Sequence, residues 1–396
     1  MKVVNIFYYY DDRVDDAEAL VRLYYTTTGW AESLLPLGVE SIFMTRFGKD
    51  DHFEKNSIRH YFIHDGSSSQ LRAWQVPLKF LREVKKLDAD VVHVHSLTLS
   101  LQTFVLRCLL PRTTAIVVQH HGGRSPGRLK RTIHNLLNKA ADAFFFTTHA
   151  QGAEWLMKQA PCPKVMPVIE GTTFFDYDSR DANLPLVYAN RAVARQETGM
   201  QGSPVFLWVG RLDDNKDPLT VLVGFALLLR KRPQSRLYMI YSDNRLETAV
   251  KQFIAQHPSL YAQTTLLGAI PHEQMPWYYN SADYFVLGSH YEGCGYAMSE
   301  AMRCGCVPIV TDIPSFHRMT NKGQLGALWQ PGNKETFLAA AIAAMSRPLA
   351  TEAQACIDYY REHLSFDAIA RVAKEHYQQV IEARRKGKAT LQPQQV

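Results

Sequence analysis

Two glycines, Gly293 and Gly295, lie between a candidate strand and a candidate helix. The apolar run Tyr284–Leu287 predicts a buried strand, and Tyr296–Cys304 is typical of a helix that Gly305 would end. A strand that feeds a helix through a glycine loop brings backbone N–H groups and the positive end of the helix dipole to the carboxyl edge of a sheet. Such an arrangement favours a diphosphate ligand.

The same segment carries two carboxylates, Glu292 in the loop and Glu300 more than one turn inside the helix. Because they lie in different elements, they do not form one acid–base pair on a helix face. Each can instead accept from a different part of an extended ligand, Glu300 from ribose hydroxyls and Glu292 from sugar hydroxyls. The alternative is a solvated loop residue and a satisfied helix charge. The apolar neighbours Ala301 and Met302 favour a buried Glu300 that needs a partner.

Two cations follow the first candidate strand of the second half of the chain. Arg211 and Lys216 come after Val205–Val209, and Asp217 is suited to cap the next helix. At the carboxyl end of a parallel strand, two such cations can bind a diphosphate. The alternative is a pair of cations on a solvated loop.

Short apolar runs alternate with helix-length segments along the whole chain. This rhythm predicts an α/β protein with parallel sheets covered on both faces. We expect strands at Val3–Tyr9, Val91–His95, Thr114–Gln119, Ala143–Thr147, Lys164–Ile169, Val205–Val209, Leu237–Tyr241, Thr264–Leu267, Tyr284–Leu287 and Val307–Thr311.

The strands fall into two groups, which predicts two domains, as does the length of 396 residues. We expect an N-terminal domain over residues 1–190 and a C-terminal domain over 191–365. Between the two strand groups lies the irregular segment Glu170–Pro204, which reads as a linker and holds a short helix around Asn190–Thr198. Residues 366–396 should form a helix that packs on either domain, followed by a polar tail.

The composition excludes several classes of protein. The net charge of +6 is mildly basic and comes with no nucleic-acid-binding motif. No apolar run reaches the length of a membrane span, and Met1–Tyr10 is too short for a signal peptide, so we expect a cytoplasmic protein. Cys294, Cys304 and Cys306 cluster without a CxxC pair, which favours small buried thiols over a metal site.

The segment 124–139 is the most basic stretch of the chain. It holds five cations and no acidic residue. We expect a helix that packs on its sheet through Leu129, Ile133, Leu136 and Leu137 and turns a basic face to solvent. The alternative is binding to a membrane surface, at the inner face of the membrane.

The stretch from Glu292 to Glu300, with Gly305 and Pro308 beyond it, resembles the E-x7-E signature of the family 4 retaining glycosyltransferases. The resemblance extends over the second half and, more weakly, the first. It implies the GT-B fold, in which two Rossmann-like domains face a cleft. It also implies a hexosyltransferase-type activity that retains the anomeric configuration without a protein nucleophile.

The resemblance also implies roles for single residues. The element Gly210-Arg211 to Lys216-Asp217 is similar to the family's diphosphate-binding G-R-x4-K-D element, and His121-Gly122 is similar to its His-Gly, whose histidine reaches the donor sugar. His93 and His95 are assigned to the fold. The expected catalytic residues are Glu292, Arg211, Lys216 and His121, and the expected donor-binding residues are Gly210, Ile270, Gly293, Cys294, Gly295, Tyr296 and Glu300.

The first half departs from the family. Its first loop lacks the usual Gly-Gly pair, and Gly29-Trp30 is a weak replacement on the acceptor side. Glu170-Gly171 stands where the family often has Asn-Gly. Because of these departures, the resemblance does not identify the acceptor-binding residues or the acceptor.

The sequence therefore predicts transfer of a sugar from a nucleotide diphosphate-sugar, without metal or other cofactor. The acceptor is a carbohydrate, a lipid-linked or a small-molecule hydroxyl. Three alternatives use the same fold: a glycan phosphorylase, a sugar-nucleotide epimerase and an inactive sugar-nucleotide-binding relative. A nicotinamide oxidoreductase is disfavoured because Met298 stands where the dinucleotide fingerprint needs a third glycine.

Overall fold

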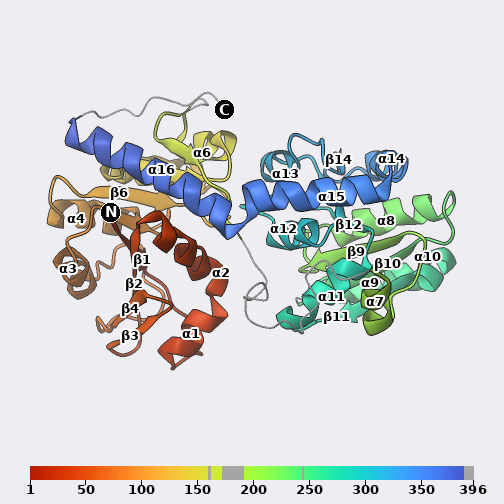
Figure 1. Ribbon diagram of the computed structural model, residues 1–396, viewed down its shortest axis with the longest axis horizontal. Coiled ribbons are helices and arrows are strands. Elements are labelled where there is room, and N and C mark those ends of the chain that lie inside the picture. The colour runs from red at the N-terminus through yellow and green to blue at the C-terminus, as the bar shows by residue number, and fades with distance from the viewer. Residues whose placement is uncertain (159–161, 172–190, 243–244, 388–396) are drawn as a thin grey trace. The chain divides into compact units, whose positions relative to one another are not determined.

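The computed structural model describes residues 1–158, 162–171, 191–242 and 245–387 (Figure 1). By their contacts the residues form two units: unit 1 is Met1–Gly171 with Phe366–Val396, and unit 2 is Thr172–Ser365. Each unit holds one predominantly parallel sheet with helices on it, which confirms the predicted α/β class with two Rossmann-like domains. The expected boundary at 190 and most of the expected linker lie outside the described residues.

Unit 1 is built on an eight-stranded sheet with the order β3-β4-β2-β1-β5-β6-β7-β8. All neighbouring strands are parallel except the edge pair of β3 and β4, which is antiparallel. The sequence did not predict β2, β3 and β4. The strands are β1 (Lys2–Phe7), β2 (Glu40–Arg46), β3 (Asp51–Lys55), β4 (Ile58–Ile63), β5 (Val91–Val94), β6 (Ala115–Gln119), β7 (Ala143–Phe146) and β8 (Val165–Pro167).

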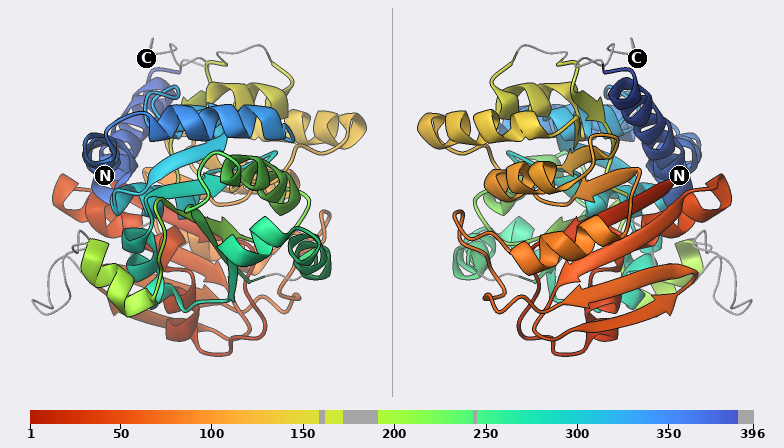
Figure 2. Two further views of the ribbon diagram at one scale, coloured as in Figure 1. Left: turned by 90° about the vertical axis from the view of Figure 1, so that its right-hand side faces the viewer. Right: turned by 90° about the vertical axis from the view of Figure 1, so that its left-hand side faces the viewer.

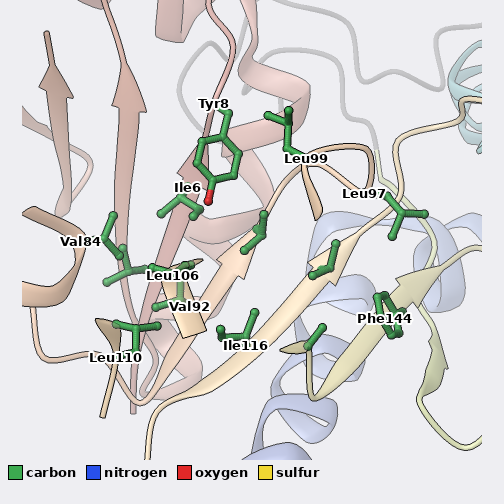
Figure 3. Close-up of a cluster of buried hydrophobic side chains, with 14 of the residues drawn as sticks. Ile6, Tyr8, Val84, Val92, Leu97, Leu99, Leu106, Leu110, Ile116 and Phe144 are labelled. Carbon is green, nitrogen blue, oxygen red and sulfur yellow. The ribbon is translucent and has the colours of Figure 1, made fainter. Parts of the chain in front are cut away.

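Two apolar clusters lie on opposite faces of this sheet, because successive strand residues such as Val3 and Val4 point to opposite sides. Figure 3 shows the first cluster, in which side chains of the central strands pack with Val84 and Leu106 from helices α3 and α4. The helical elements of unit 1 are α1 (Ala17–Leu23), α2 (Tyr25–Thr28), η1 (Gly29–Leu37), α3 (Leu78–Lys86), α4 (Ser100–Leu109), α5 (Arg128–Leu137), η2 (Asn138–Ala140), α6 (His149–Leu156) and α16 (Phe366–Arg385).

The C-terminal helix α16 covers the second face of the unit 1 sheet together with η1 (Figure 2). Tyr377 of α16 forms a hydrogen bond to His93 Nδ1 at 2.7 Å, which ties the end of the chain to the centre of the first sheet. The helix packs on unit 1 through a mostly buried apolar side that includes Ile369, Tyr377 and Ile381, whereas Val372 is exposed.

Unit 2 has a six-stranded parallel sheet with the order β11-β10-β9-β12-β13-β14. Its five predicted strands are present, and the short edge strand β14 was not predicted. The strands are β9 (Val205–Gly210), β10 (Arg236–Tyr241), β11 (Thr264–Gly268), β12 (Tyr284–Leu287), β13 (Val307–Thr311) and β14 (Ala327–Trp329).

Helices alternate with these strands, as the pattern predicted. Asp217 accepts a hydrogen bond from the Thr220 N–H at 3.1 Å and so caps α8, as expected. Gly305 has a φ of 71° just beyond α12, a backbone conformation that favours glycine. The helical elements are α7 (Arg191–Thr198), α8 (Pro218–Leu229), α9 (Glu247–Ala255), α10 (Pro258–Gln263), η3 (His272–Gln274), α11 (Met275–Ser281), α12 (Tyr296–Arg303), α13 (Pro314–Met319), α14 (Lys334–Met345), α15 (Leu349–Tyr359) and η4 (Tyr360–Leu364).

The basic helix α5 is oriented differently from the expectation. Its neighbours in unit 1 are α4 and α6. Of the four side chains expected to pack inward, Leu129, Ile133 and Leu136 are exposed and Leu137 is half-buried, and the buried residue of the helix is His134. The prediction of a helix packed through its leucines was therefore wrong. Across the described residues, no helix is both long and apolar enough to span a membrane.

Candidate functional site

The two predicted donor loops of unit 2 start at neighbouring strands. β9 and β12 pair in the centre of the sheet, and the later strands lead away from them in opposite directions, to β10 and β11 on one side and to β13 and β14 on the other. At such a switch point the loops at the carboxyl ends diverge and leave a crevice where ligands of open α/β sheets bind. The fold thus brings the loop 211–217 beside the loop 288–295.

Backbone and side-chain hydrogen bonds join these two loops. The His290 N–H donates to the Asn215 carbonyl at 2.8 Å, and the Asn215 amide donates to the Tyr291 carbonyl at 2.9 Å. His290 Nε2 lies 3.1 Å from Asp217 Oδ2. The loops therefore form one connected structure without any ligand.

Lys216 and Glu292 form a close ion pair across the two loops. Their side chains are only 16% and 12% exposed. The alternatives of a solvated surface cation and a solvated loop carboxylate are therefore wrong for these two residues. A half-buried charge pair has strong electrostatic interactions with any charged ligand that reaches it.

Arg211 lies at the same edge, but it is more exposed. Its Nε is 3.0 Å from Asp213 Oδ2, and Arg245 Nη2 is also 3.0 Å from that oxygen. The buried Asp213 also accepts from the Lys216 N–H at 2.9 Å. This carboxylate therefore holds both predicted cations in place. Arg245 was missed, because it lies after β10 and no local motif links it to the other two.

Glu300 is buried in α12 and is hydrogen-bonded inside unit 2. Its Oε1 lies 2.9 Å from His272 Nε2, and its Oε2 accepts from the Tyr279 hydroxyl at 3.0 Å. The hydrogen bond to Glu300 raises the pKa of His272 above its ordinary value of 6.5. Burial raises the pKa of Tyr279 well above 10. Glu300 has the partner that the sequence required, so its burial alone does not call for a ligand.

A carboxylate offers about four lone-pair positions, so Glu300 can accept from more than one donor at a time. His272 and Tyr279 approach different oxygens of this carboxylate.

The N-terminus of α12 follows the glycine loop directly. Gly295 is its N-cap, and no side chain caps this end. A Cβ at Gly295 would lie 2.5 Å from the Phe316 ring, so packing also requires glycine here. Cys294 is buried with Sγ 3.7 Å from Met319 Sδ, and Tyr296 is half-buried.

The three clustered cysteines are buried and free of disulfides. Burial raises the thiol pKa of Cys304 and of Cys306. Both are therefore small apolar side chains at neutral pH, as expected.

Two further predicted donor residues lie at the carboxyl edge of the sheet. Gly210 is the last residue of β9, and a Cβ there would lie 3.2 Å from Trp208 and 3.5 Å from Lys216. Ile270 is half-buried in the turn after β11, two residues before His272. The contact of Ile270 with a base stays a prediction.

In unit 1, a chain of hydrogen bonds runs through the histidines at the carboxyl edge. His95 Nε2 is 3.1 Å from Asn5 Oδ1, and His95 Nδ1 is 3.0 Å from His121 Nε2. The Asn5 oxygen only accepts, so His95 donates from Nε2 and accepts at Nδ1 from His121. His121 Nδ1 contacts the Glu170 carboxylate. Both ring nitrogens of His121 are thus engaged within unit 1.

The neighbouring histidines belong to the core, as expected for His93 and His95. His120 stacks on Phe146 and donates from Nε2 to the Gly123 carbonyl at 2.8 Å. His93 is fully buried, and burial lowers its pKa to about 3. Of the histidines at this edge, His121 is the one whose side chain is substantially accessible, at 29%.

A cavity of about 730 Å³ opens in unit 1 beside the loop that follows β1. The loop contributes aromatic, acidic and basic residues to the lining, the basic one being Arg13, and His60 from β4 lies in its wall. Burial lowers the pKa of His60 to about 4, so this ring is neutral at pH 7. Its lining residues include Tyr9, Tyr10, Asp11, Asp12, Tyr24, Thr28, Thr45 and Gln70.

The expected acceptor-side pair lies elsewhere. Trp30 is buried in the cluster that joins η1 to α16, where it contacts His93 edge-on. A Cβ at Gly29 would meet the ring of Tyr25. Both residues therefore have a packing role, and a role at the acceptor stays a prediction.

Two family models match the chain. The model of glycosyl transferases group 1 matches residues 190–363, and the model of glycosyltransferase family 4 matches residues 26–166. Between them they cover the two donor loops of unit 2 and His121 of unit 1, but not β1 or the loop that follows it.

Curated relatives match over parts of their length. Mannosylfructose-phosphate synthase of Agrobacterium fabrum is 31% identical over 157 residues, which are 38% of this chain and 34% of that protein. GDP-mannose:cellobiosyl-diphosphopolyprenol alpha-mannosyltransferase of Xanthomonas oryzae is 26% identical over 250 residues, which are 61% of this chain and 60% of that protein. The chain thus matches about a third and three fifths of these two relatives.

The fold matches that of solved structures over nearly the whole chain. Sucrose-phosphate synthase of Thermosynechococcus elongatus superposes with a TM-score of 0.71 at 18% identity, and the match covers 96% of this chain and 99% of that one. The likeness shows that the fold is GT-B.

Proposed function

The chain belongs to family 4 of the GT-B glycosyltransferases, and from this we propose that it transfers a sugar from a nucleotide diphosphate-sugar to an acceptor hydroxyl. The observation that carries the proposal is the Lys216–Glu292 ion pair at the switch point of unit 2. It places a cation and a carboxylate beside the N-terminus of α12, where a diphosphate and a sugar have separate partners.

The donor would bind by an exchange of partners. Lys216 gives up Glu292 for the diphosphate oxygens, and Glu292 becomes free to accept from a sugar hydroxyl. Arg211 can exchange Asp213 for phosphate in the same way. Glu300 accepts from the ribose. The diphosphate replaces Glu292 as the negative partner of Lys216, and sugar hydroxyls replace Lys216 as the donors to Glu292, so neither charge is left without a partner.

The leaving group is the nucleoside diphosphate. As the bond from the anomeric carbon to its oxygen breaks, Lys216, Arg211 and the α12 N-terminus stabilise the developing charge. The acceptor oxygen bonds to the anomeric carbon on the face that the diphosphate leaves, and its proton passes to the departing diphosphate oxygen. This is the retaining outcome that family membership implies. His121 would bind the donor sugar only after releasing His95 or Glu170.

These groups supply positive charge without a metal ion. We expect EDTA to leave the rate of donor turnover unchanged within twofold. Loss of activity that Mg²⁺ or Mn²⁺ restores would refute the metal-free mechanism and leave the transfer itself standing.

The cavity beside β1 is the proposed acceptor site. Its tyrosines can stack on a sugar ring, and Asp12 can accept from hydroxyls. The mannosyltransferase relative is named for a diphosphopolyprenol-linked acceptor and for GDP-mannose as donor. We therefore propose a carbohydrate acceptor, with lipid-linked glycans as the first class to test.

The test is the release of nucleoside diphosphate from purified protein. The chain is incubated with GDP-sugars and UDP-sugars, with and without acceptor, and the best donor is chosen by thermal shift. Hydrolysis without acceptor, accelerated by acceptor, supports glycosyl transfer. Donor binding without turnover would indicate an inactive binding relative, and formation of a sugar phosphate from a glycan and phosphate would indicate a phosphorylase.

A further inference from the structure

The helix α5 turns its apolar side to solvent. Leu129, Ile133 and Leu136 are 80%, 54% and 62% exposed, and their spacing places them on one side of the helix. The opposite side attaches the helix to unit 1, where the buried His134 forms a hydrogen bond with Ser100 at 2.7 Å. Three large exposed aliphatic side chains on one short helix are unusual for a face that meets only water.

Another apolar side chain lies beside this face. Met157, at the end of α6, is 48% exposed, and its sulfur lies 3.9 Å from Thr132 Oγ1 of α5. The exposed apolar surface thus continues from α5 onto α6.

The charged residues of the segment that carries this face all have one sign. The segment 124–139 holds Arg124, Arg128, Lys130, Arg131 and Lys139 and no acidic residue. Arg128 and Lys130 are exposed next to Leu129. Glu154 of α6 is the nearby acid, and it accepts from Ser125 at the start of the segment. A helix with an aliphatic stripe and flanking cations has the character of a helix that lies in a membrane interface.

We propose that α5 docks on an anionic lipid surface, with Leu129, Ile133 and Leu136 in the interface and Arg128 and Lys130 on the lipid phosphates. The charge favours lipid over a second copy of the chain, because a symmetric pairing of this face would bring its cations together. Its apolar side chains favour a bilayer over a purely charged partner such as a nucleic acid.

Docking of α5 would also place the carboxyl edge of unit 1, where His121 lies, near the membrane. The loop 122–127 is all that separates His121 from α5, so a docked α5 holds this edge of unit 1 close to the bilayer. A lipid-linked acceptor would be presented there. This consequence rests on the proposed function, whereas the docking itself does not.

The experiment is co-sedimentation of the full chain with vesicles. Phosphatidylcholine vesicles are compared with vesicles that also contain phosphatidylglycerol. We expect binding to the anionic vesicles that weakens as salt rises. The triple variant Leu129→Ser, Ile133→Ser, Leu136→Ser should bind at least about a hundredfold more weakly, because three buried aliphatic side chains are lost from the interface. Arg128→Glu with Lys130→Glu should bind roughly tenfold or more weakly.

Two control variants test whether the loss of binding is specific to α5. Leu78→Ser removes an exposed leucine from α3, and Arg230→Glu with Lys231→Glu makes the same change of charge on unit 2. Both should sediment like the parent chain. Since the α5 side chains are exposed, the triple variant should keep its thermal midpoint and its donor hydrolysis.

Three outcomes would overturn the proposal. They are no binding to anionic vesicles, binding that the triple variant retains, and a concentration-dependent dimer that the triple variant abolishes. If the parent chain sediments with vesicles but never hydrolyses a donor, the docking stands and the proposed function fails.

Discussion

The carboxyl edges of the two sheets present different chemistry. In unit 2, each charged group of the candidate site has an opposite charge or a hydrogen-bond partner: Lys216 with Glu292, Arg211 with Asp213, and His272 with Glu300. In unit 1, aromatic rings line the cavity together with the charged loop residues Asp11, Asp12 and Arg13. Burial lowers the pKa of His60 in its wall, so that ring is neutral. At the unit 2 edge, a diphosphate can replace the carboxylate partners of Lys216 and Arg211. The unit 1 edge instead offers ring faces for stacking and carboxylates that can accept from hydroxyls.

Because of this difference, substitutions at the two edges should affect donor binding and acceptor use separately. A change at the unit 2 edge should alter the binding or departure of a charged group, and its effect should not depend on the acceptor. A change in the unit 1 cavity should alter the use of acceptor and leave donor binding as it is. Unit 2 variants that alter acceptor use, or unit 1 variants that alter donor binding, would contradict this assignment of the two edges.

The largest effect is expected for Lys216→Ala. Lys216 faces charge that grows as the diphosphate departs, so turnover at saturating donor should fall by about 10²–10³-fold, with a smaller change in donor affinity. Initial rates and calorimetry measure the two quantities. Lys251→Ala removes another ion-paired lysine of unit 2, on the exposed surface, and serves as control. An unaltered rate at saturation would remove Lys216 from the mechanism.

Glu300→Ala should weaken donor binding by about tenfold or more, because a hydrogen bond to a charged group contributes on the order of 1.5–3 kcal/mol. The substitution also leaves Tyr279 and His272 without their shared partner. Tyr279→Phe tests that second effect, since it removes one hydrogen bond and keeps the carboxylate. Calorimetric donor affinity that matches the parent chain would refute the ribose role of Glu300.

The sequence predicted the donor edge better than the acceptor edge, for a physical reason. Glu292 and Glu300 lie in a strand, a glycine loop and a helix that follow one another within some twenty residues. The bounds of this strand and helix were therefore predicted to within one residue. Their partners come from distant segments: Lys216 follows another strand, and Tyr279 lies on another helix. Only the strand order brings these groups together.

Two other errors have local causes. β3 lies at the sheet edge with charged, exposed residues, so its run Asp51–Lys55 lacks the apolar pattern of a strand. For α5, the periodicity of Leu129, Ile133 and Leu136 correctly indicated one apolar side. Periodicity does not say what meets that side, and in this helix it is solvent rather than the sheet.

On the acceptor side, Tyr9→Ala should raise the acceptor KM by about five- to tenfold through loss of a stacking surface. Tyr9 lines the cavity and is 40% exposed. Tyr261→Ala is the control, because it removes an exposed tyrosine from unit 2. A change in donor affinity with an unchanged acceptor KM would reverse the assignment of the two edges.

The smallest effect should come from pH. Because Glu300 raises the pKa of His272 above 6.5, the protonated pair stabilises unit 2 fully below pH 6.5 and loses that contribution as pH rises through the raised value. The difference in thermal midpoint between the parent chain and His272→Gln should therefore shrink from pH 6 to pH 9, by about 1–2 °C, since solvent screens a ring that is 39% exposed. A difference that grows with pH would mean that neutral His272 is the form that Glu300 holds. The donor edge would then lack one of the charge pairs that distinguish it from the edge of unit 1.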